Sequence, residues 1–484
     1  MLVSTALAAV GPFLPALNGT FLGWDDRRAL VDFDGWRSGS WLESIRWAFT
    51  SLDMGMYRPL TWLSYRLDFA LSGLEPAAFH RTNLVIHALV AGLAVAALRR
   101  WVAAARLELD ERWAALVALA FAVHPLRVQV VAWVSARADA LATAFFLVAV
   151  LAWLRFVETR SVGARVAWHV AFAGSLLCKP IALAAPVVFF IAGWWLTRRR
   201  PSFADVLIGL TMSAAISLPL ALAKGVVHSG GGLPQLPASA AFTALHNSVQ
   251  PLWKVLWPMS LGIAEPAWPF EPFEVPYVVG ALAAVALATF IWSRRAQTPG
   301  LAVTALAWLA LMGPMLGVVP FGYELTADRF SYLPTLALLP GALWLMSRLP
   351  RRQWLAVAAP VLLFWSVLAW QHTGVWQTSE QLWRYTLAQN PRSALALTGL
   401  GDDLLKQNRV AEGEALYLRA IEWLPPYEPT LLGLGFADLA QGRPHAAIPK
   451  LNRYIETHPE NRAARRFLDA AEDARDALDA QRAQ

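Results

Sequence analysis

The sequence predicts an all-α protein, in which a polytopic bundle of membrane helices is followed by a C-terminal solenoid of short helices. Hydrophobic residues make up 57% of the 484 residues and charged residues only 15%, whereas soluble domains carry about 25% charged residues. Several apolar runs, such as 83–101, 140–154 and 277–292, approach the roughly 20 residues that a helix needs to cross a bilayer. A 34-residue repeat then occupies the end of the chain. We therefore expect a membrane domain over 1–370 and a repeat domain over 371–484.

The apolar runs predict about eleven spans. They lie near residues 2–17, 84–100, 113–126, 138–154, 166–178, 181–197, 205–223, 277–293, 301–319, 332–347 and 353–370. The first of these contains Pro12 and Pro15 and has no basic flank.

Alternate loops between these spans are rich in arginine, which predicts that they face the cytoplasm. Their arginines are Arg99, Arg100, Arg106, Arg112, Arg155, Arg160, Arg165, Arg198, Arg199, Arg200, Arg294, Arg295, Arg348, Arg351 and Arg352. The segments predicted to face outward are 18–83, 127–137, 224–276, 320–331 and everything after 371. The tail holds 13 basic and 15 acidic residues, so the net charge of +7 comes from the membrane part. This distribution sets topology and argues against a nucleic-acid partner.

The first outer loop, 18–83, contains a predicted amphipathic helix at 40–52. Ser40 and Glu43 have the spacing of a capping box, and Leu42, Ile45 and Phe49 recur at helical spacing. We expect this helix to lie on the membrane surface, although an ordinary loop helix would show the same pattern.

The tail repeats with a period of 34 residues. Equivalent positions are Pro391, Pro425 and Pro459; Trp383, Tyr417 and Leu451; and Leu387, Ile421 and Ile455. This period resembles tetratricopeptide (TPR) repeats. We expect repeats at about 394–427 and 428–461 and a capping helix at 462–484. Such arrays mostly bind peptides on a concave face.

Two adjacent carboxylates, Asp25 and Asp26, lie in the first outer loop. A carboxylate at the outer surface is a candidate general base for an incoming hydroxyl group. A solvated loop turn is the ordinary interpretation of such a pair in isolation.

Cationic side chains on the outer side oppose the positive-inside bias. Arg137, Lys179 and Arg329 each lie beside a proline or an acidic residue. One such residue alone would be interpreted as a snorkelling anchor, but the three together favour a site for an anionic phosphate head group. Arg127 is a further candidate for this site.

Other polar residues interrupt apolar sequence nearby. His80, Asn83 and His87 fall on one face of the second span, where helix–helix hydrogen bonding and a ligand-facing role are both open. The ligand spacing of a zinc site is absent, so we expect no metal here. The candidates for the substrate cleft are Arg58, His80, His87, His124, Asp139 and Tyr332.

Several motifs resemble, in order and spacing, the transmembrane and tetratricopeptide-repeat O-mannosyltransferase family, particularly its bacterial relatives, within the GT-C superfamily. They are "GWDD" (23–26), "YRPLTWLSYRLD" (57–68), "VHPLRVQVVAWVSARADAL" (123–141), "CKPIALAAP" (178–186) and "ADRFSYLP" (327–334). The resemblance implies a GT-C-like membrane domain that transfers a sugar to Ser/Thr hydroxyls on the non-cytoplasmic side. In the eukaryotic members the sugar is mannose from dolichyl phosphate mannose. It also implies that Asp25 or Asp26 is the base and that Lys179 and Arg329 lie near the donor phosphate.

The chain departs from that family in several places, among them Ala138, where a basic residue is usual, and Gly193 and Trp194, where an acidic residue is expected. Arg127 and Gln129 stand where the bacterial pattern has a second histidine and a glutamate. Because Gln129 cannot accept a proton as a carboxylate does, an acid–base or metal role at this position is in doubt.

The leading hypothesis is therefore a glycosyltransferase that uses a polyprenyl-phosphate sugar as donor and a protein or peptide bound by the repeats as acceptor. No cofactor is expected with certainty, and a need for divalent metal stays open. We expect a bacterial inner (plasma) membrane location with an extracytoplasmic or periplasmic tail. The alternatives are a non-catalytic membrane-anchored TPR scaffold for envelope assembly, and a lipid-linked-sugar ligase or transporter acting on polysaccharide.

Overall fold

The structure is a computed structural model that describes residues 1–198, 201–223, 239–263, 265–266, 274–317, 324–348, 351–423, 428–459 and 461–483. Some predicted features lie outside these residues. They are Arg199, Arg200, Pro425, residues 224–238, 264 and 267–273 of the outer segment 224–276, and residues 320–323 of the outer segment 320–331.

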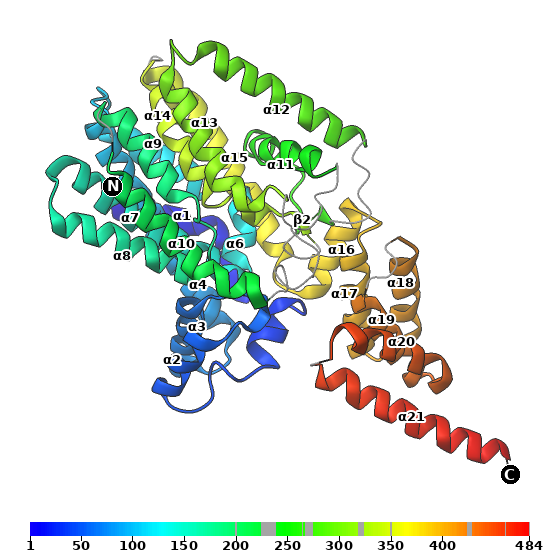
Figure 1. The fold of residues 1–484 in the computed structure, drawn as a ribbon. Helices are drawn as coiled ribbons and strands as arrows, with labels where there is room; N and C mark the ends of the chain where they lie inside the picture. Colours follow the sequence, from blue (N-terminus) through cyan, green and yellow to red (C-terminus); the bar gives the residue numbers. More distant parts are fainter. Residues whose placement is uncertain are drawn as a thin grey trace. The chain divides into compact units, whose positions relative to one another are not determined.

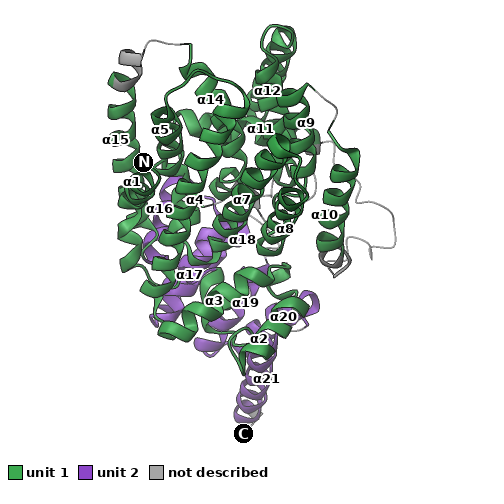
Figure 2. Cartoon of the chain, turned by 90° about the vertical axis from the view of Figure 1, so that its left-hand side faces the viewer, with its two compact units in different colours: residues 1–21, 25–264, 271–377 green, residues 22–24, 265–270, 378–484 purple. Residues whose placement is uncertain are grey.

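The chain divides into two compact units (Figure 2). Unit 1 comprises residues 1–21, 25–264 and 271–377, and unit 2 comprises residues 22–24, 265–270 and 378–484. A short piece of the first outer loop thus belongs to the same unit as the tail. The assignment of the two units to a glycosyltransferase domain and a repeat domain stays a prediction.

The described part of unit 1 is helical apart from one short strand, β2 (Glu324–Thr326) (Figure 1). A second short strand, β1 (Glu265–Pro266), belongs to unit 2. The α-helices of unit 1 are α1 (Leu2–Val10), α2 (Trp41–Thr50), α3 (Pro59–Ser72), α4 (Pro76–Ala104), α5 (Glu111–Ala122), α6 (Val128–Ala132), α7 (Arg137–Thr159), α8 (Val162–Cys178), α9 (Ala185–Thr197), α10 (Phe203–Ala223), α11 (Ser239–Leu256), α12 (Val275–Arg294), α13 (Pro299–Met312), α14 (Leu339–Met346) and α15 (Arg351–Val375). Shorter turns are η1 (Gly11–Asn18), η2 (Arg27–Val31), η3 (Asp53–Gly55), η4 (Pro125–Arg127), η5 (Val134–Ala136), η6 (Gly313–Met315), η7 (Asp328–Ser331) and η8 (Pro334–Leu338).

Four described helical segments are long and apolar enough to cross a membrane: 76–104, 134–159, 275–294 and 356–375. The pair α5 and α6, bent by 60°, would make a fifth. Shorter apolar helices occupy 2–18, 162–178, 185–197, 203–218 and 299–315. The chain therefore has the helices of a membrane protein, and the number of about eleven spans stays a prediction.

Two predicted spans differ from the helices observed. The span near 332–347 consists of two short helices, η8 and α14, because Pro334 and Pro340 interrupt a regular hydrogen-bond ladder. The span near 113–126 ends at Ala122, and the chain bends before Pro125.

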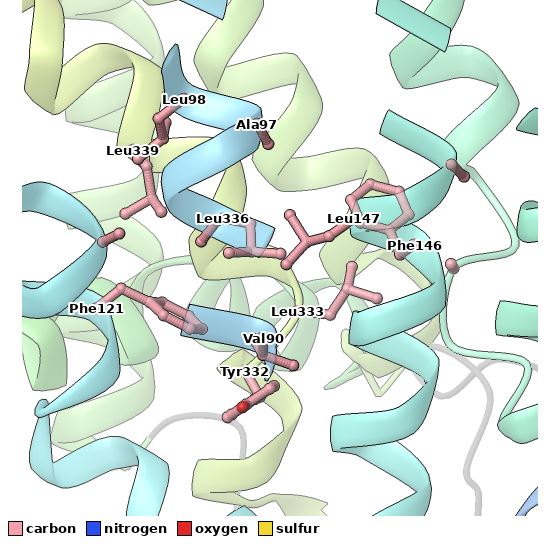
Figure 3. Close-up of a cluster of buried hydrophobic side chains, with 14 of the residues drawn as sticks. Val90, Ala97, Leu98, Phe121, Phe146, Leu147, Tyr332, Leu333, Leu336 and Leu339 are labelled. Atoms are coloured by element: carbon pink, nitrogen blue, oxygen red, sulfur yellow. The ribbon is translucent and has the colours of Figure 1, made fainter. Parts of the chain in front are cut away.

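The main hydrophobic core of unit 1 forms between α4, α5, α7 and the segment that follows η7. Figure 3 shows Val90, Phe121, Phe146 and Leu336 directed toward one another from these elements. These side chains are almost fully removed from solvent. The core fixes helices α4 and α7, which carry several of the candidate site residues.

The first outer loop has a second core of its own. Trp36, Trp62, Tyr65 and Phe79 are buried there together. Because these side chains come from the segment before α2, from α3 and from the start of α4, the loop from Asp25 onward is an ordered part of unit 1.

Helix α2 confirms the predicted capping box in this loop. The Ser40 hydroxyl accepts from the Glu43 amide at 3.3 Å, and the Glu43 carboxylate accepts from the Ser40 amide at 2.6 Å. Leu42 is 75% exposed, and Ile45 and Phe49 are 41% exposed. An unburied apolar stripe of this kind fits the expected membrane-surface helix.

Unit 2 contains six helices among its described residues: α16 (Ser379–Gln389), α17 (Ala394–Lys406), α18 (Val410–Trp423), α19 (Glu428–Ala440), α20 (Pro444–Thr457) and α21 (Arg462–Ala483). Large side chains of one helix pack on glycines of a neighbouring helix, and these contacts recur after 34 residues. Gly399 faces Trp383 as Gly433 faces Tyr417, and Gly401 faces Tyr417 as Gly435 faces Leu451. A Cβ atom at these glycines would collide with the facing side chain. The 34-residue period therefore corresponds to a repeated packing contact.

Candidate active site

The two adjacent aspartates have different surroundings. Asp26 is completely buried, and its carboxylate accepts hydrogen bonds from the backbone amide and hydroxyl of Ser135, at 2.8 Å and 2.5 Å. Asp25, one residue earlier, is only half-buried. The structure thus gives Asp26 the contacts of an anchor between the first outer loop and η5, and leaves Asp25 accessible to a ligand.

The positive charges of four side chains act on the Asp25 carboxyl group. Desolvation by the neighbouring protein raises the pKa of the Asp25 carboxyl, while Arg58, Arg329, Arg28 and Lys179 act in the opposite direction, in that order. A carboxyl group whose pKa is raised although several cations lie near it is typical of a functional site.

Lys179 lies immediately after α8 and forms an ion pair with Asp139 in the first turn of α7. Its Nζ donates to the two carboxylate oxygens of Asp139 at 2.7 Å and 3.0 Å, and both side chains are buried. Desolvation lowers the pKa of Lys179, Asp139 raises it, and the positive charges of Arg329 and Arg58 lower it again. Lys179 therefore belongs to the same electrostatic cluster as Asp25.

Arg58 precedes α3 and is buried, with only 5% of its surface exposed. Its guanidinium lies over the ring of Trp62, 4.6 Å from the ring centre. Its Nε is buried and has no hydrogen-bond partner among the residues that the structure describes. A buried guanidinium with an unused donor is suited to an anionic ligand.

Arg329, in η7, completes this group of cations. Its guanidinium lies 5.2 Å from the ring centre of Trp133 and 4.9 Å from that of Phe330. Its backbone amide donates to the Oε1 atom of Gln129 at 2.8 Å. We call Asp25, Arg58, Lys179 and Arg329 the acid–cation cluster.

Arg137 is predicted to bind phosphate, and the structure places it in an internal network. Its Nη2 pairs with Asp68 at 2.6 Å and donates to the Phe79 carbonyl at 2.8 Å, and its Nε donates to Asn83 at 2.7 Å. Arg137 is fully buried. These contacts are those of a brace between α3, α4 and α7.

Arg127 is also engaged with protein acceptors. Its guanidinium donates to the carbonyls of Ser331 and Tyr332 at 3.5 Å and 3.4 Å and to the Thr335 hydroxyl at 3.3 Å. These weak contacts join η4 to η7 and η8.

The three histidines proposed for the substrate cleft are all buried. His87 contacts the Tyr332 hydroxyl at 2.7 Å and the Ala122 carbonyl at 3.1 Å. His124 accepts from the Leu126 amide at 3.1 Å and lies 3.0 Å from the Val255 carbonyl. His80 packs against Gly19, where a Cβ atom would lie 2.9 Å from its Nε2.

Through these contacts His87, His124 and Tyr332 join neighbouring segments of unit 1. None of the three is a member of the acid–cation cluster. His80, Asn83 and His87 do share the buried face of α4, as their spacing predicts. Within the described residues no group of three or more His, Cys, Asp or Glu side chains is arranged to hold a metal ion.

Gln129, the departure from the family pattern, uses both ends of its amide. Its Nε2 donates to the Ile263 carbonyl at 2.7 Å, and its Oε1 accepts from the Arg329 amide. A glutamate could accept from Arg329 but could not donate to Ile263 unless protonated. The amide is therefore matched to these two partners.

Some partners of the site were not proposed as site residues from the sequence. Asp68 pairs with Arg137, Ser135 donates to Asp26, and Asp328 pairs with Lys254 at 2.8 Å. The signal for Asp68, Ser135 and Asp328 was their position inside the quoted motifs, and their partners could not be predicted because such pairs join segments far apart in the chain.

Comparison with known proteins finds partial similarity to protein O-mannosyl-transferases. The chain is 37% identical over 123 residues to human protein O-mannosyl-transferase TMTC2, covering 25% of this chain and 14% of that protein. It is 40% identical over 99 residues to mouse TMTC3 (20% of this chain, 10% of that protein) and 32% identical over 181 residues to Drosophila melanogaster Tmtc1 (36% and 20%). No family model and no solved structure matches the chain.

The chain thus aligns with a fifth or less of the length of each of these three relatives. The similarity is therefore to a limited stretch of these relatives, and the long apolar helices are those of a membrane protein.

Proposed function

We propose that this protein is an integral-membrane glycosyltransferase that moves a sugar, mannose or another hexose, from a polyprenyl-phosphate donor to a hydroxyl acceptor. Serine and threonine side chains of proteins are the proposed acceptors. The observation that carries the proposal is the acid–cation cluster, in which one accessible carboxylate is surrounded by cations from separate elements.

In this reaction Asp25 accepts the proton of the acceptor hydroxyl while the hydroxyl oxygen attacks the anomeric carbon of the sugar. The bond between that carbon and the phosphate oxygen breaks, and the polyprenyl phosphate leaves. A single displacement of this kind inverts the anomeric configuration. Asp25 is the base and not Asp26, because both hydrogen bonds from Ser135 fall on Asp26, which has no exposed surface.

The cations have a specific role in this step. The donor phosphate is a diester with one negative charge, and the departing monoester carries close to two. Arg58, Arg329 and Lys179 therefore interact more strongly with the transition state than with the bound donor, which lowers the barrier. The unused Nε of Arg58 supplies a donor for this developing charge.

A lipid-linked donor also needs an apolar surface for its tail. Unit 1 contains an apolar cavity of about 110 Å³. Its lining includes Leu98, Trp101, Phe146, Leu147, Val150, Trp153, Phe189, Thr304, Leu311 and Leu336, of which only Thr304 and the two tryptophans carry a polar atom. Leu147 is two helical turns beyond Asp139 on α7, or about 12 Å at 1.5 Å per residue. A polyprenyl chain that starts at Lys179, the partner of Asp139, would reach this cavity along α7.

The arginine-rich loops predict that the acid–cation cluster lies on the non-cytoplasmic side. A bacterial inner membrane with unit 2 on its outer side is the proposed location. The 34-residue packing repeat of unit 2 fits a TPR array, whose proposed task is to hold the acceptor protein or peptide.

The proposal is tested by transfer from a panel of labelled polyprenyl-phosphate sugars to envelope proteins that co-purify with the chain. The purified protein in nanodiscs is compared with Arg58→Gln, and with Arg384→Gln as a matched control at an exposed ion pair of unit 2. We expect transfer from at least one donor and loss of most of it in Arg58→Gln alone. Absence of transfer from every donor, with a co-purifying partner retained, would instead support the scaffold hypothesis.

A further inference from the structure

Helix α11 exposes apolar side chains and buries polar ones, which is the opposite of a helix at the surface of a soluble protein. Such a surface helix buries an apolar stripe and exposes its polar residues. The α11 side chains that the structure describes as exposed are all apolar, and they fall within an arc of about 120° at 3.6 residues per turn. They are Ala241, Leu245, Trp253 and Leu256. The apolar stripe of α11 therefore faces away from the rest of unit 1.

The buried face of α11 is mostly polar, and its groups are bound within unit 1. The side-chain amide of Asn247 donates to the Leu316 carbonyl at 3.2 Å. The Ser248 carbonyl accepts from the indole nitrogen of Trp308, in α13, at 2.8 Å. The polar side chains that are buried on this face are Thr243, His246, Asn247 and Ser248. These contacts fix the rotation of α11 about its own axis and so keep its apolar stripe directed outward.

The last turn of α11 is attached to η7, the turn that holds Arg329. The Nζ atom of Lys254 donates to one carboxylate oxygen of Asp328 at 2.8 Å, and the Gly262 amide donates to the other oxygen at 3.0 Å. The Lys254 side chain thus points inward and is largely buried. Because Asp328 is adjacent to Arg329, α11 and one member of the acid–cation cluster have a common support.

The same end of α11 carries an exposed apolar patch. Trp253 is 63% exposed, Leu256 74% and Trp257 56%. The Trp257 amide donates to the Trp253 carbonyl at 2.8 Å, so these three residues lie within about one helical turn. We call them the α11 patch. An exposed patch of this kind marks contact with a protein or a membrane, and tryptophan is enriched at membrane–water interfaces.

Helix α12, next to α11 in unit 1, is one of the segments long and apolar enough to cross a membrane (Figure 1). The two helices approach closely, because the rings of His246 and Tyr277 lie 4.6 Å apart. Gly280 permits this approach, since a Cβ atom there would lie 2.5 Å from Nδ1 of His246. The surroundings of α12 therefore bear directly on those of α11.

The surface of α12 indicates that lipid, and not protein, covers this region. Of the side chains of α12, only Ala281 and Ala284 are buried. Large apolar side chains such as Val279, Leu282 and Phe290 are exposed along the helix. A helix of this length that crosses a bilayer presents such side chains to the hydrocarbon core. The apolar stripe of α11 continues this surface on a neighbouring helix.

We infer that α11 lies at the membrane–water interface with lipid against the α11 patch, on the side of the membrane that carries the acid–cation cluster. The sequence agrees with this side, because α11 falls within the outward segment 224–276. The opposite face of the helix supports Arg329 through Lys254 and Asp328. The cluster then lies at the level of the lipid head groups, where the phosphate of a lipid-linked donor is found. The lipid contact goes beyond the proposed function, since it holds whatever reaction the protein performs.

The test measures the depth of single labelled positions in the full-length protein, in nanodiscs of phosphatidylcholine and phosphatidylglycerol. Leu256→Cys and Trp257→Cys are each labelled with an environment-sensitive thiol dye. Cys178, the only native cysteine, is fully buried, so the folded protein reacts at the introduced cysteine. Quenching is measured with a nitroxide near the lipid head group, with a nitroxide near the end of the acyl chain, and with iodide in the water.

Two matched variants calibrate the three quenchers. Leu418→Cys changes the same residue type at an exposed position of α18, outside the candidate membrane spans, and its label should respond to iodide alone. Leu282→Cys lies near the middle of α12, and its label should respond most strongly to the deep nitroxide.

The inference predicts an intermediate depth for the α11 patch. An interfacial helix buries its apolar face about 5–10 Å into the head-group boundary, so the shallow nitroxide should quench the labels at positions 256 and 257 about twofold more strongly than the deep one. Labels that respond to iodide alone would show that the patch lies in water and overturn the inference. Labels that no quencher reaches would show that protein covers the patch, and chiefly deep quenching would place α11 in the bilayer core; either result also overturns it. No donor is needed for these readouts, so they decide the inference even if the proposed function fails.

Discussion

Replacing Arg137 by glutamine should destabilise unit 1 strongly while leaving the donor affinity of the folded protein unchanged. The Arg137 guanidinium and the Asp68 carboxylate have 0% and 6% of their side-chain surface exposed and lie 2.6 Å apart. In the variant, Asp68 would keep the Thr82 hydroxyl as a partner but lose its counter-ion. Removing one member of a buried pair typically costs about 3–5 kcal/mol, or about 6–10 °C in the unfolding midpoint at roughly 2 °C per kcal/mol.

The chain contains a convenient reporter for this measurement. Cys178 is its only cysteine and is fully buried, so reaction with a thiol-specific dye during heating reports unfolding in detergent. Arg384→Gln, at an exposed pair, should shift the midpoint by far less. The double variant Asp68→Asn/Arg137→Gln should recover much of the loss, because no buried charge is left unpaired.

An opposite pattern would refute this interpretation of Arg137. If Arg137→Gln is as stable as the wild type and the KM for the donor rises tenfold or more, Arg137 binds the phosphate, as its position in the sequence first predicts.

Three other outcomes are expected. Because desolvation raises the pKa of Asp25, transfer should be lost as pH falls through a value above the ordinary 3.8 of an aspartate, and an acid limb at or below 3.8 in a pH–kcat/KM profile would contradict this. Gln129→Glu should lower stability by about 1–3 kcal/mol, since a carboxylate cannot donate to the Ile263 carbonyl; higher transfer in this variant would mean that the position works as an acid or base. Burial raises the pKa of Asp402 from 3.8 to about 6, so the folded state binds more protons than the unfolded state between these values. Stability should therefore fall as pH rises from about 4 to 6, and thermal unfolding of Asp402→Asn should lack this slope, while an identical slope in both proteins would show that another group is responsible.

Local patterns in the sequence predicted local structure well. The spacing of Ser40 and Glu43 predicted the start of α2, and the spacing of His80, Asn83 and His87 predicted their common buried face on α4. Each of these features depends on residues within two helical turns, so the sequence contains all the information needed.

Partners that join distant segments could not be predicted in the same way. Arg137 and Lys179 are equally strong candidates for phosphate binding in the sequence, since each is a cation beside apolar residues and is predicted to face outward. The structure distinguishes them through Asp68, which lies 69 positions before Arg137 and packs against it because α3 contacts α7. The roles of Asp25 and Asp26 are distinguished in the same way, because the distant Ser135 donates to Asp26.

The helix-breaking effect of prolines explains why one predicted span is not a single regular helix. Hydrophobicity alone favoured a single helix over 332–347, yet Pro334 and Pro340 divide it into short helices. This irregular segment follows directly after Arg329 in η7, so the departure from a regular span lies beside the acid–cation cluster.

The most direct test of the central claim is the rate of sugar transfer at saturating donor in Asp25→Asn and Asp26→Asn, measured beside donor binding. The account predicts that Asp25→Asn loses transfer while it binds donor and unfolds at the wild-type temperature. Asp26→Asn should unfold earlier, because its contacts with Ser135 are weakened, and should keep measurable transfer when folded. Transfer that survives in Asp25→Asn at the wild-type rate would contradict the assignment of Asp25 as the base.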